Sequence, residues 1–155
     1  MRICSSSPCV LAEGVHVGWR ALESVAVAFP FGHGLSYTRF NYSFASAPTL
    51  AYEAGGVRPR VGLEVSVRNV GTRAAREVVQ LYLRNAEPLT TLRLFEKTRE
   101  LPPGEVATVV FSLPPDAFDV FDYALGAMAP VRPLAEHTLL VGASSRDIRL
   151  EYALS

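Results

Sequence analysis

Residues 61–68 alternate strictly between apolar and other side chains, and this alternation constrains the fold more than any other feature of the chain. The apolar positions are Val61, Leu63, Val65 and Val67, and between them lie Gly62, Glu64, Ser66 and Arg68. A period of two places successive side chains on opposite faces of an extended chain. One apolar face and one wet face are typical of an antiparallel sheet that covers a core. The pattern therefore predicts a strand that ends at the turn of residues 69–71.

Further short strands follow, separated by turn signals such as Pro102-Pro103-Gly104-Glu105. Residues 77–83 are apolar on both faces, as expected of a central strand that is covered on both sides. Other strands are predicted at residues 92–101, 106–113, 118–123, 136–143 and 148–152, with loops at 45–59 and 124–135. No segment has the period of an amphipathic helix. The predicted fold class is all-β, an antiparallel β-sandwich of the immunoglobulin-like or fibronectin type III-like kind.

The composition excludes several classes of partner. The chain has 155 residues with 15 basic and 15 acidic side chains, so its formal net charge is zero. We therefore expect neither nucleic acid nor an anionic membrane as a partner, and no apolar run has the length of a membrane helix. Charged residues make up 19% of the chain, against about 25% in typical soluble domains. This low share predicts apolar surface that another domain covers.

Residues 29–38 join an irregular N-terminal segment to the predicted sandwich. Residues 13–31 are predicted to be a strand or extended chain. Gly32 and Gly34 bracket His33 and allow the backbone to take positive φ angles. The predicted apolar anchors of this bend are Leu35, Tyr37 and Phe40.

The glycines of this joint complete neither a nucleotide loop nor a nucleophile elbow. A dinucleotide-binding loop needs a third glycine where the chain has Tyr37, and a helix after it. A nucleophile elbow needs the pattern Gly-x-Ser-x-Gly, which Ser36 does not complete. Neither type of site is therefore predicted here.

Three aspartates, Asp116, Asp119 and Asp122, recur at a spacing of three. They could form an acid/base pair or a calcium site, but a calcium loop also needs glycine and a bidentate glutamate at set offsets. The prolines before them and the phenylalanines beside them favour a turn that leads into a strand. The favoured interpretation is a solvated turn.

The histidines and cysteines give no firm site. His33 is a general base by residue type, but its place between two glycines predicts a packed or hydrogen-bonded structural side chain. His137 alternates with apolar residues and is predicted at the edge of the core. Cys4 and Cys9 could close a small loop or bind a metal, but the histidines show no zinc-type spacing with them. Both are predicted to be free thiols, and we expect no metal or other cofactor.

Aromatic side chains near the joint admit two roles, a platform for sugar stacking or a part of the core. They are Tyr37, Phe40, Tyr42 and Phe44. Because the last three share one face of a predicted strand, core packing is the favoured interpretation. Trp19 is the exposed aromatic candidate for a ligand contact.

Several motifs together resemble one known family. They are EGVHVGWR (residues 13–20), FPFGHGLSYTRFNYS (29–43), VSVRNVGTRAAREVVQLYL (65–83), LRLFEKTRELPPGE (92–105) and LLVGASSRDIRL (139–150). In order and spacing they are similar to the C-terminal part of glycoside hydrolase family 3, the β-glucosidase and β-xylosidase group. Trp19 stands where that family usually has tyrosine. Glycine is common in the family at the positions of Ala75, Leu94 and Ala135, which puts the local turn geometry in question.

The resemblance implies a division of the chain into two parts, and it gives this chain no catalytic site. It implies that residues 1–37 are a remnant of a preceding α/β domain with its junction, and that residues 38–155 are a fibronectin type III-like sandwich. Family members are retaining glycosidases, with an aspartate nucleophile in a Ser-Asp-Trp type motif of the first domain and an acid/base in the second. Neither segment is present, since Gly18 precedes the single tryptophan. No catalytic, cofactor-binding or metal-binding residue is therefore predicted.

Three functions stay open at this point. The first is a non-catalytic accessory domain that packs on the catalytic domains of a β-glucosidase-type enzyme and stabilises them. The second is a stand-alone immunoglobulin-like module that binds carbohydrate or protein. The third is an enzyme in its own right, which would need a pair of buried carboxyl groups in a pocket.

Overall fold

The computed structural model describes residues 16–52, 59–85, 90–122, 126–130, 135 and 137–154. The elements are η1 (Gly18–Leu22), β1 (Phe40–Phe44), β2 (Thr49–Tyr52), β3 (Pro59–Asn69), β4 (Val78–Arg84), β5 (Thr90–Lys97), β6 (Val106–Leu113), η2 (Pro115–Phe118), β7 (Asp119–Asp122), β8 (Ala127–Pro130), β9 (Thr138–Gly142) and β10 (Ile148–Ala153). Both η elements are short 3-10 helices. None of the helices in these ranges is long and apolar enough to cross a membrane.

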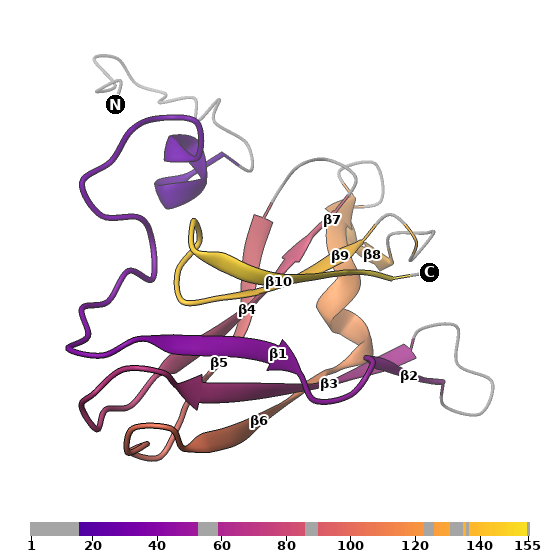
Figure 1. Ribbon diagram of the computed structural model, residues 1–155. Coiled ribbons are helices and arrows are strands. Elements are labelled where there is room, and N and C mark those ends of the chain that lie inside the picture. Colours follow the sequence, from indigo (N-terminus) through magenta and orange to yellow (C-terminus); the bar gives the residue numbers. More distant parts are fainter. Residues whose placement is uncertain are drawn as a thin grey trace.

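The strands form two four-stranded antiparallel sheets and one hairpin (Figure 1). In the first sheet, β3 is central, with β1 and β2 on one side and β6 on the other. The second sheet has the order β10-β9-β4-β5, and β7 pairs with β8. The predicted all-β fold of the fibronectin type III-like kind is therefore confirmed.

The core lies between the inner faces of the two sheets. The four apolar residues of the alternating stretch on β3 are all buried, and their neighbours along the strand are not. From β1, Phe40 and Tyr42 are buried and Phe44 packs against the same core, so the predicted core packing of these aromatics is confirmed. Each large apolar side chain that is fully buried contributes about 1.5–3 kcal/mol of transfer free energy.

Strand β4 is buried on both faces, as its sequence predicts. Val79, Leu81 and Leu83 point into the core, whereas Tyr82 and Gln80 face the other way and are also buried. Their cover is the N-terminal segment, which runs beside this sheet (Figure 1). The sandwich therefore has a partial third layer, which covers β4 at Gln80 and Tyr82.

Several elements differ from the sequence-based expectation. β2 and β8 lie in the predicted loops 45–59 and 124–135. Strands of four residues are too short to show a clear alternation, and these two are fixed by pairing with β3 and β7. β5 ends at Lys97, and Leu101 makes only an isolated bridge.

Residues 18–22 form a 3-10 helix where extended chain was expected. Gly18 has a φ of 60°, which glycine adopts without steric cost. Carbonyl groups at the far end of this helix accept hydrogen bonds from the Arg146 side chain. Because free helix carbonyls need such partners, a distant part of the chain stabilises the turn.

Asn69, at the end of β3, connects four segments through its buried side-chain amide. Its Nδ2 donates to the carbonyl oxygens of Arg73 and Leu101, each at 2.7 Å. Its Oδ1 accepts from the Thr38 hydroxyl (2.7 Å) and the Gly71 N–H (3.1 Å). One side chain thus holds the end of the joint, the turn after β3 and the bridge at Leu101.

We predict that Asn69→Ala lowers the free energy of unfolding by about 3 kcal/mol, because buried carbonyl groups lose their donor. Asn41→Ala, in the exposed row of β1, is the matched control and should change it by less than about 0.5 kcal/mol. Urea titration followed by circular dichroism measures both. Equal effects of the two substitutions would contradict the role given to Asn69.

Candidate functional site

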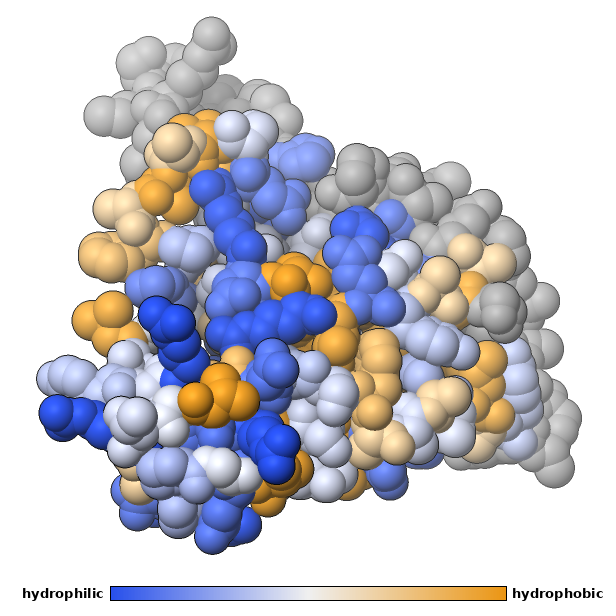
Figure 2. Space-filling view, viewed as in Figure 1, coloured by the Kyte–Doolittle hydropathy of each residue, from blue (hydrophilic) through white to orange (hydrophobic). Residues whose placement is uncertain are grey.

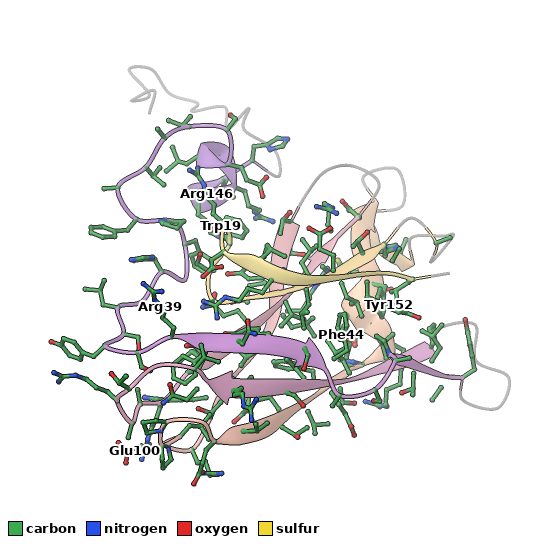
Figure 3. The ribbon with its side chains drawn as sticks, in the orientation of Figure 1. Trp19, Arg39, Phe44, Glu100, Arg146 and Tyr152 are labelled. Carbon is green, nitrogen blue, oxygen red and sulfur yellow. The ribbon has the colours of Figure 1, made fainter. Side chains whose placement is uncertain are left out.

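The N-terminal segment, residues 16–38, is fixed to the β9–β10 turn by hydrogen bonds. The Arg146 guanidinium donates to the carbonyl oxygens of Leu22 (2.7 Å), Glu23 (3.2 Å) and Val25 (2.6 Å). The backbone N–H of Ser145 donates to the carbonyl oxygen of Phe31 (2.9 Å). Figure 3 shows Arg146 and Trp19 at this contact.

Trp19 is half-buried, so its predicted exposure is wrong. Its ring stacks on Phe31, with ring centroids 4.9 Å apart and planes 8° apart. It also meets Tyr82 edge-on at 6.2 Å. Burial raises the pKa of the Tyr82 phenol to about 12. Trp19 is turned inward because the outer face of β4 needs an apolar cover.

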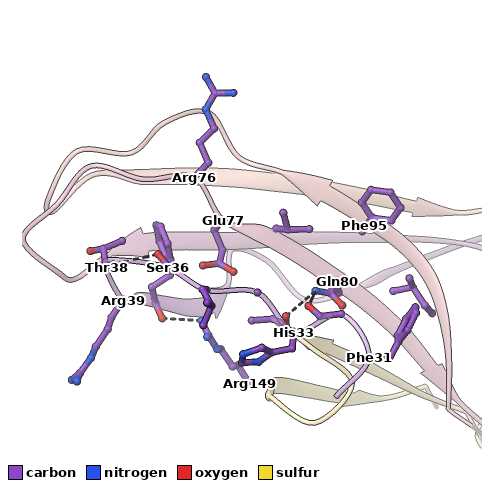
Figure 4. Close-up of a pocket in the computed structure, with 17 residues that line it drawn as sticks. Phe31, His33, Ser36, Thr38, Arg39, Arg76, Glu77, Gln80, Phe95 and Arg149 are labelled. Atoms are coloured by element: carbon purple, nitrogen blue, oxygen red, sulfur yellow. Dashed lines mark hydrogen bonds between the residues drawn. The ribbon is translucent and has the colours of Figure 1, made fainter. Parts of the chain in front are cut away.

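A groove of about 790 Å³ lies between the joint and the sheet (Figure 4). The joint supplies one wall, with residues from Phe31 to Phe40. The other wall is made by β4, β5 and the residues just before β4, and it includes Glu77, Leu92 and Phe95. This groove is the candidate functional site.

Gln80 closes one end of the groove. Its side-chain amide donates to the carbonyl oxygens of Gly32 (3.0 Å) and Ala143 (2.8 Å), and its Oε1 accepts from the Tyr82 hydroxyl. Gly32 has a φ of 78°, and a Cβ atom there would collide with the Gln80 side chain. The predicted positive φ is thus confirmed for Gly32, whereas Gly34 does not adopt one.

Arg149 holds the other end. It donates to the carbonyl oxygen of Phe40 (2.9 Å) and to both carboxylate oxygens of Asp147 (3.2 and 2.8 Å), and it lies 4.5 Å above the Tyr42 ring. Burial opposes the charge of the guanidinium. The Asp147 hydrogen bond, together with the acidic groups around the guanidinium, outweighs burial, so the pKa of Arg149 is raised. The same hydrogen bond, above all, lowers the pKa of Asp147.

Glu77 lies half-buried in the groove wall, near Arg149 and Tyr42. Burial raises the pKa of this carboxyl above its usual value and outweighs the attraction of Arg149. The Tyr42 hydroxyl interacts with Glu77 but has no hydrogen bond of ordinary geometry in the described ranges. Burial, followed by the Glu77 charge, raises the pKa of Tyr42 as well. The cluster therefore holds the pKa of Glu77 above its usual value, with burial as the largest cause.

The apolar anchors predicted for the joint are mostly wrong. Leu35 and Tyr37 are each 91% exposed, and only Phe40 enters the core. Further exposed apolar side chains on the same N-terminal segment are Val17, Leu22, Val25, Phe29 and Phe31. Figure 2 shows apolar side chains gathered along this segment. The segment thus presents an apolar surface that the sandwich itself does not cover.

The two histidines differ in their surroundings. His33 is exposed, and its ring lies 5.3 Å from that of Phe29. Gln80 and Arg149 bind the two ends of the bend around it. His137 is buried and meets Phe118 edge-on at 5.6 Å, so it lies inside the core.

The aspartates do not form the solvated turn that was expected. Asp116 is exposed, but Asp119 is buried, because the chain turns inward after η2 to begin β7. Burial lowers the pKa of Arg93, and the charges of Asp116 and Asp119 act against that shift. The Asp122 side chain and the cysteines Cys4 and Cys9 lie outside the described residues. Within those residues, no group of three His, Cys, Asp or Glu side chains could hold a metal ion.

Comparison with known proteins identifies the domain type. Residues 77–145 match the fibronectin type III-like domain family. The chain is 37% identical to thermostable beta-glucosidase B of Acetivibrio thermocellus over 90% of its own length and 18% of that protein. It is 33% identical to probable beta-glucosidase D of Aspergillus niger, over 97% of its length and 22% of that protein.

Solved structures agree with these sequence matches. The beta-D-glucoside glucohydrolase of Trichoderma reesei superposes with a TM-score of 0.80 at 31% identity, over all of this chain and 24% of that one. The GH3 beta-glucosidase of Bifidobacterium adolescentis superposes with a TM-score of 0.76 at 30% identity. The match covers 92% of this chain and 21% of that one. The chain thus spans about a fifth of the length of these relatives. The chain is similar to the C-terminal region of these β-glucosidases, and residues 77–145 of it are the fibronectin type III-like domain.

Proposed function

We propose that this chain is a non-catalytic accessory part of a β-glucosidase-type glycoside hydrolase. The parent activity is hydrolysis of terminal β-glycosidic bonds in carbohydrate catabolism. The sandwich packs on the catalytic domains and stabilises them. The observation that carries this proposal is the apolar N-terminal segment, which covers one sheet of the sandwich and turns Leu35 and Tyr37 outward.

The proposed division places residues 1–37 with the preceding α/β domain and residues 38–155 with the sandwich. The contrast across this boundary supports it. Tyr37 is almost fully exposed, whereas Phe40 is buried in the sandwich core. None of the described residues before the boundary, 16–37, is fully buried, which is expected of a segment that completes a different domain.

We assign no residue of this chain to catalysis. Retaining glycosidases need two carboxyl groups about 5 Å apart across the scissile bond. The described carboxyl with a raised pKa, Glu77, faces Arg149 and Tyr42, and the neighbouring Asp147 is bound by Arg149 through both oxygens. This arrangement suits a structural support of the joint.

A second candidate is contact with carbohydrate in the joint groove, either within the larger enzyme or as a stand-alone binding module. Phe95 is 65% exposed, and Phe31 lines the same groove. Apolar ring faces next to polar groups such as Gln80 suit the two kinds of surface on a sugar ring.

A chromogenic β-glucoside assay on the purified chain tests the main proposal. We expect no turnover above the buffer blank, because the two carboxyl groups of a retaining mechanism are not assigned here. Sustained turnover would overturn the proposal. A thermal melt with soluble β-glucan oligomers runs beside the assay, and a rise in Tm on adding them would favour the second candidate.

Exchange of the exposed apolar residues tests the docking surface. We predict that the double variant Leu35→Ser and Tyr37→Ser binds less of an apolar dye such as ANS. Its free energy of unfolding should stay within about 0.5 kcal/mol of the parent chain, since both side chains are exposed here. A loss of stability with unchanged dye binding would show that these residues pack within this chain.

Glu77→Gln tests the cluster under the joint. A raised pKa in the folded state means that the contribution of Glu77 to stability is present at low pH and is lost as pH rises above its usual 4.5. The Tm of Glu77→Gln should therefore rise relative to the parent chain between about pH 4 and pH 8. Glu96→Gln, an exposed carboxylate on β5, is the matched control. A Tm difference that is flat or falls over this range would contradict the raised pKa of Glu77.

A further inference from the structure

The edge strands of the two large sheets differ in how well they are protected. An open strand edge pairs readily with another chain unless charges, bulges or short length prevent it. β5 carries Arg93, Glu96 and Lys97 and has a register shift against β4. β10 carries Arg149 and Glu151, with a register shift against β9. Both of these edges are therefore protected against pairing with another chain.

On the far side of β3 from β6, the edge is also protected. β2 has only four residues. β1 has five, and the carbonyl oxygen of Phe40 at its start accepts a hydrogen bond from Arg149. β6 is the exception among the edges. Its eight residues, VATVVFSL, include no charge and no proline, and its register with β3 is continuous from residue 106 to residue 113.

The hydrogen-bond pattern shows which groups of β6 face outward. The N–H of Asn69 donates to the carbonyl oxygen of Glu105 (2.9 Å), so the backbone polar groups of the odd residues face across this pair of strands. In an antiparallel pair of strands, every second residue bonds to the partner strand through its backbone. The odd residues of β6 therefore turn their N–H and C=O groups toward β3. The same groups of the even residues face the free edge. These residues are Val106, Thr108, Val110 and Ser112.

A groove lies beside the free edge, and a side-chain contact protects the start of this edge. A groove of about 550 Å³ is lined by residues 96–99 and 106–110. Arg99 donates to the carbonyl oxygen of Val106 at 3.4 Å and pairs with Glu105 at 2.7 Å. This contact covers the first free carbonyl, and no hydrogen bond between described residues engages the outward backbone groups of Thr108, Val110 and Ser112. Val110 is 63% exposed, although it is a large apolar residue.

We propose that β6 is the pairing strand of a homodimer, in which two copies of the chain join antiparallel along this edge with Val110 at the two-fold axis. This register leaves the Arg99 contact intact and sets Thr108 opposite Ser112 of the second copy. β-Branched and hydroxyl side chains are favourable cross-strand neighbours. The uncharged strand and the zero net charge of the chain impose no repulsion between copies.

Light scattering coupled to size exclusion tests the proposal. The chain with Leu35→Ser and Tyr37→Ser is used as the background, so that the two most exposed apolar side chains of the joint do not contribute to association. At about 100 µM this protein should run at twice the 16.9 kDa mass of one chain, as expected for a weak pairing of edge strands. Adding Val110→Lys should weaken the dimer at least about tenfold, because a lysine on the edge opposes pairing.

Val70→Lys is the matched control, since Val70 is also an exposed valine (53%) but lies outside β6. It should leave the dimer intact. Amide exchange gives a second readout, in which Thr108, Val110 and Ser112 gain protection as concentration rises and Val109 does not. A background protein that stays monomeric, or equal effects of the two lysine variants, would overturn the proposal.

Discussion

The structure depends on covering both faces of the β10-β9-β4-β5 sheet. One face meets the other sheet and forms the core. The other face carries Tyr82 and Gln80, which are buried although they point away from that core. A buried phenol and a buried amide need both apolar contact and hydrogen-bond partners. The N-terminal segment provides both, through the ring of Trp19 and the backbone of Gly32.

This cover explains the shape of the joint. Gln80 and Arg149 bind its two ends through backbone carbonyl oxygens, and the residues between them arch away from the sheet. The arch forms one wall of a groove and leaves two apolar residues, Leu35 and Tyr37, nearly fully exposed. Such a segment is stable where further protein covers its outer side, which is the basis of the proposed role within a family 3 enzyme.

Much of the fold could be predicted from the sequence, because burial on one face leaves a period of two. The alternation on β3 and the doubly apolar β4 are the clearest cases. β2 and β8 were not predicted, since four residues carry too little pattern. Pairing with β3 and β7, which lie elsewhere in the chain, decides their structure.

The candidate site was harder to predict, because its residues are functional only by position. In the sequence, nothing distinguishes Glu77, Gln80 and Arg149 from other residues in or beside strands. Their contacts with the joint and with one another form only when the joint crosses the sheet. Trp19 is named by its residue type, but its burial depends on Tyr82, which lies far away in the sequence. Leu35 and Tyr37 look like anchors because they are apolar. The sequence alone does not determine which surface an apolar residue packs against.

The most direct test of this account uses Trp19, the single tryptophan of the chain. Its fluorescence reports the cover, and far-ultraviolet circular dichroism reports the sheets. If the N-terminal segment is an integral layer, the two signals should change together in one cooperative transition on heating. A tryptophan transition that is complete well before the sheets unfold would show that the cover is dispensable, and would contradict the central claim.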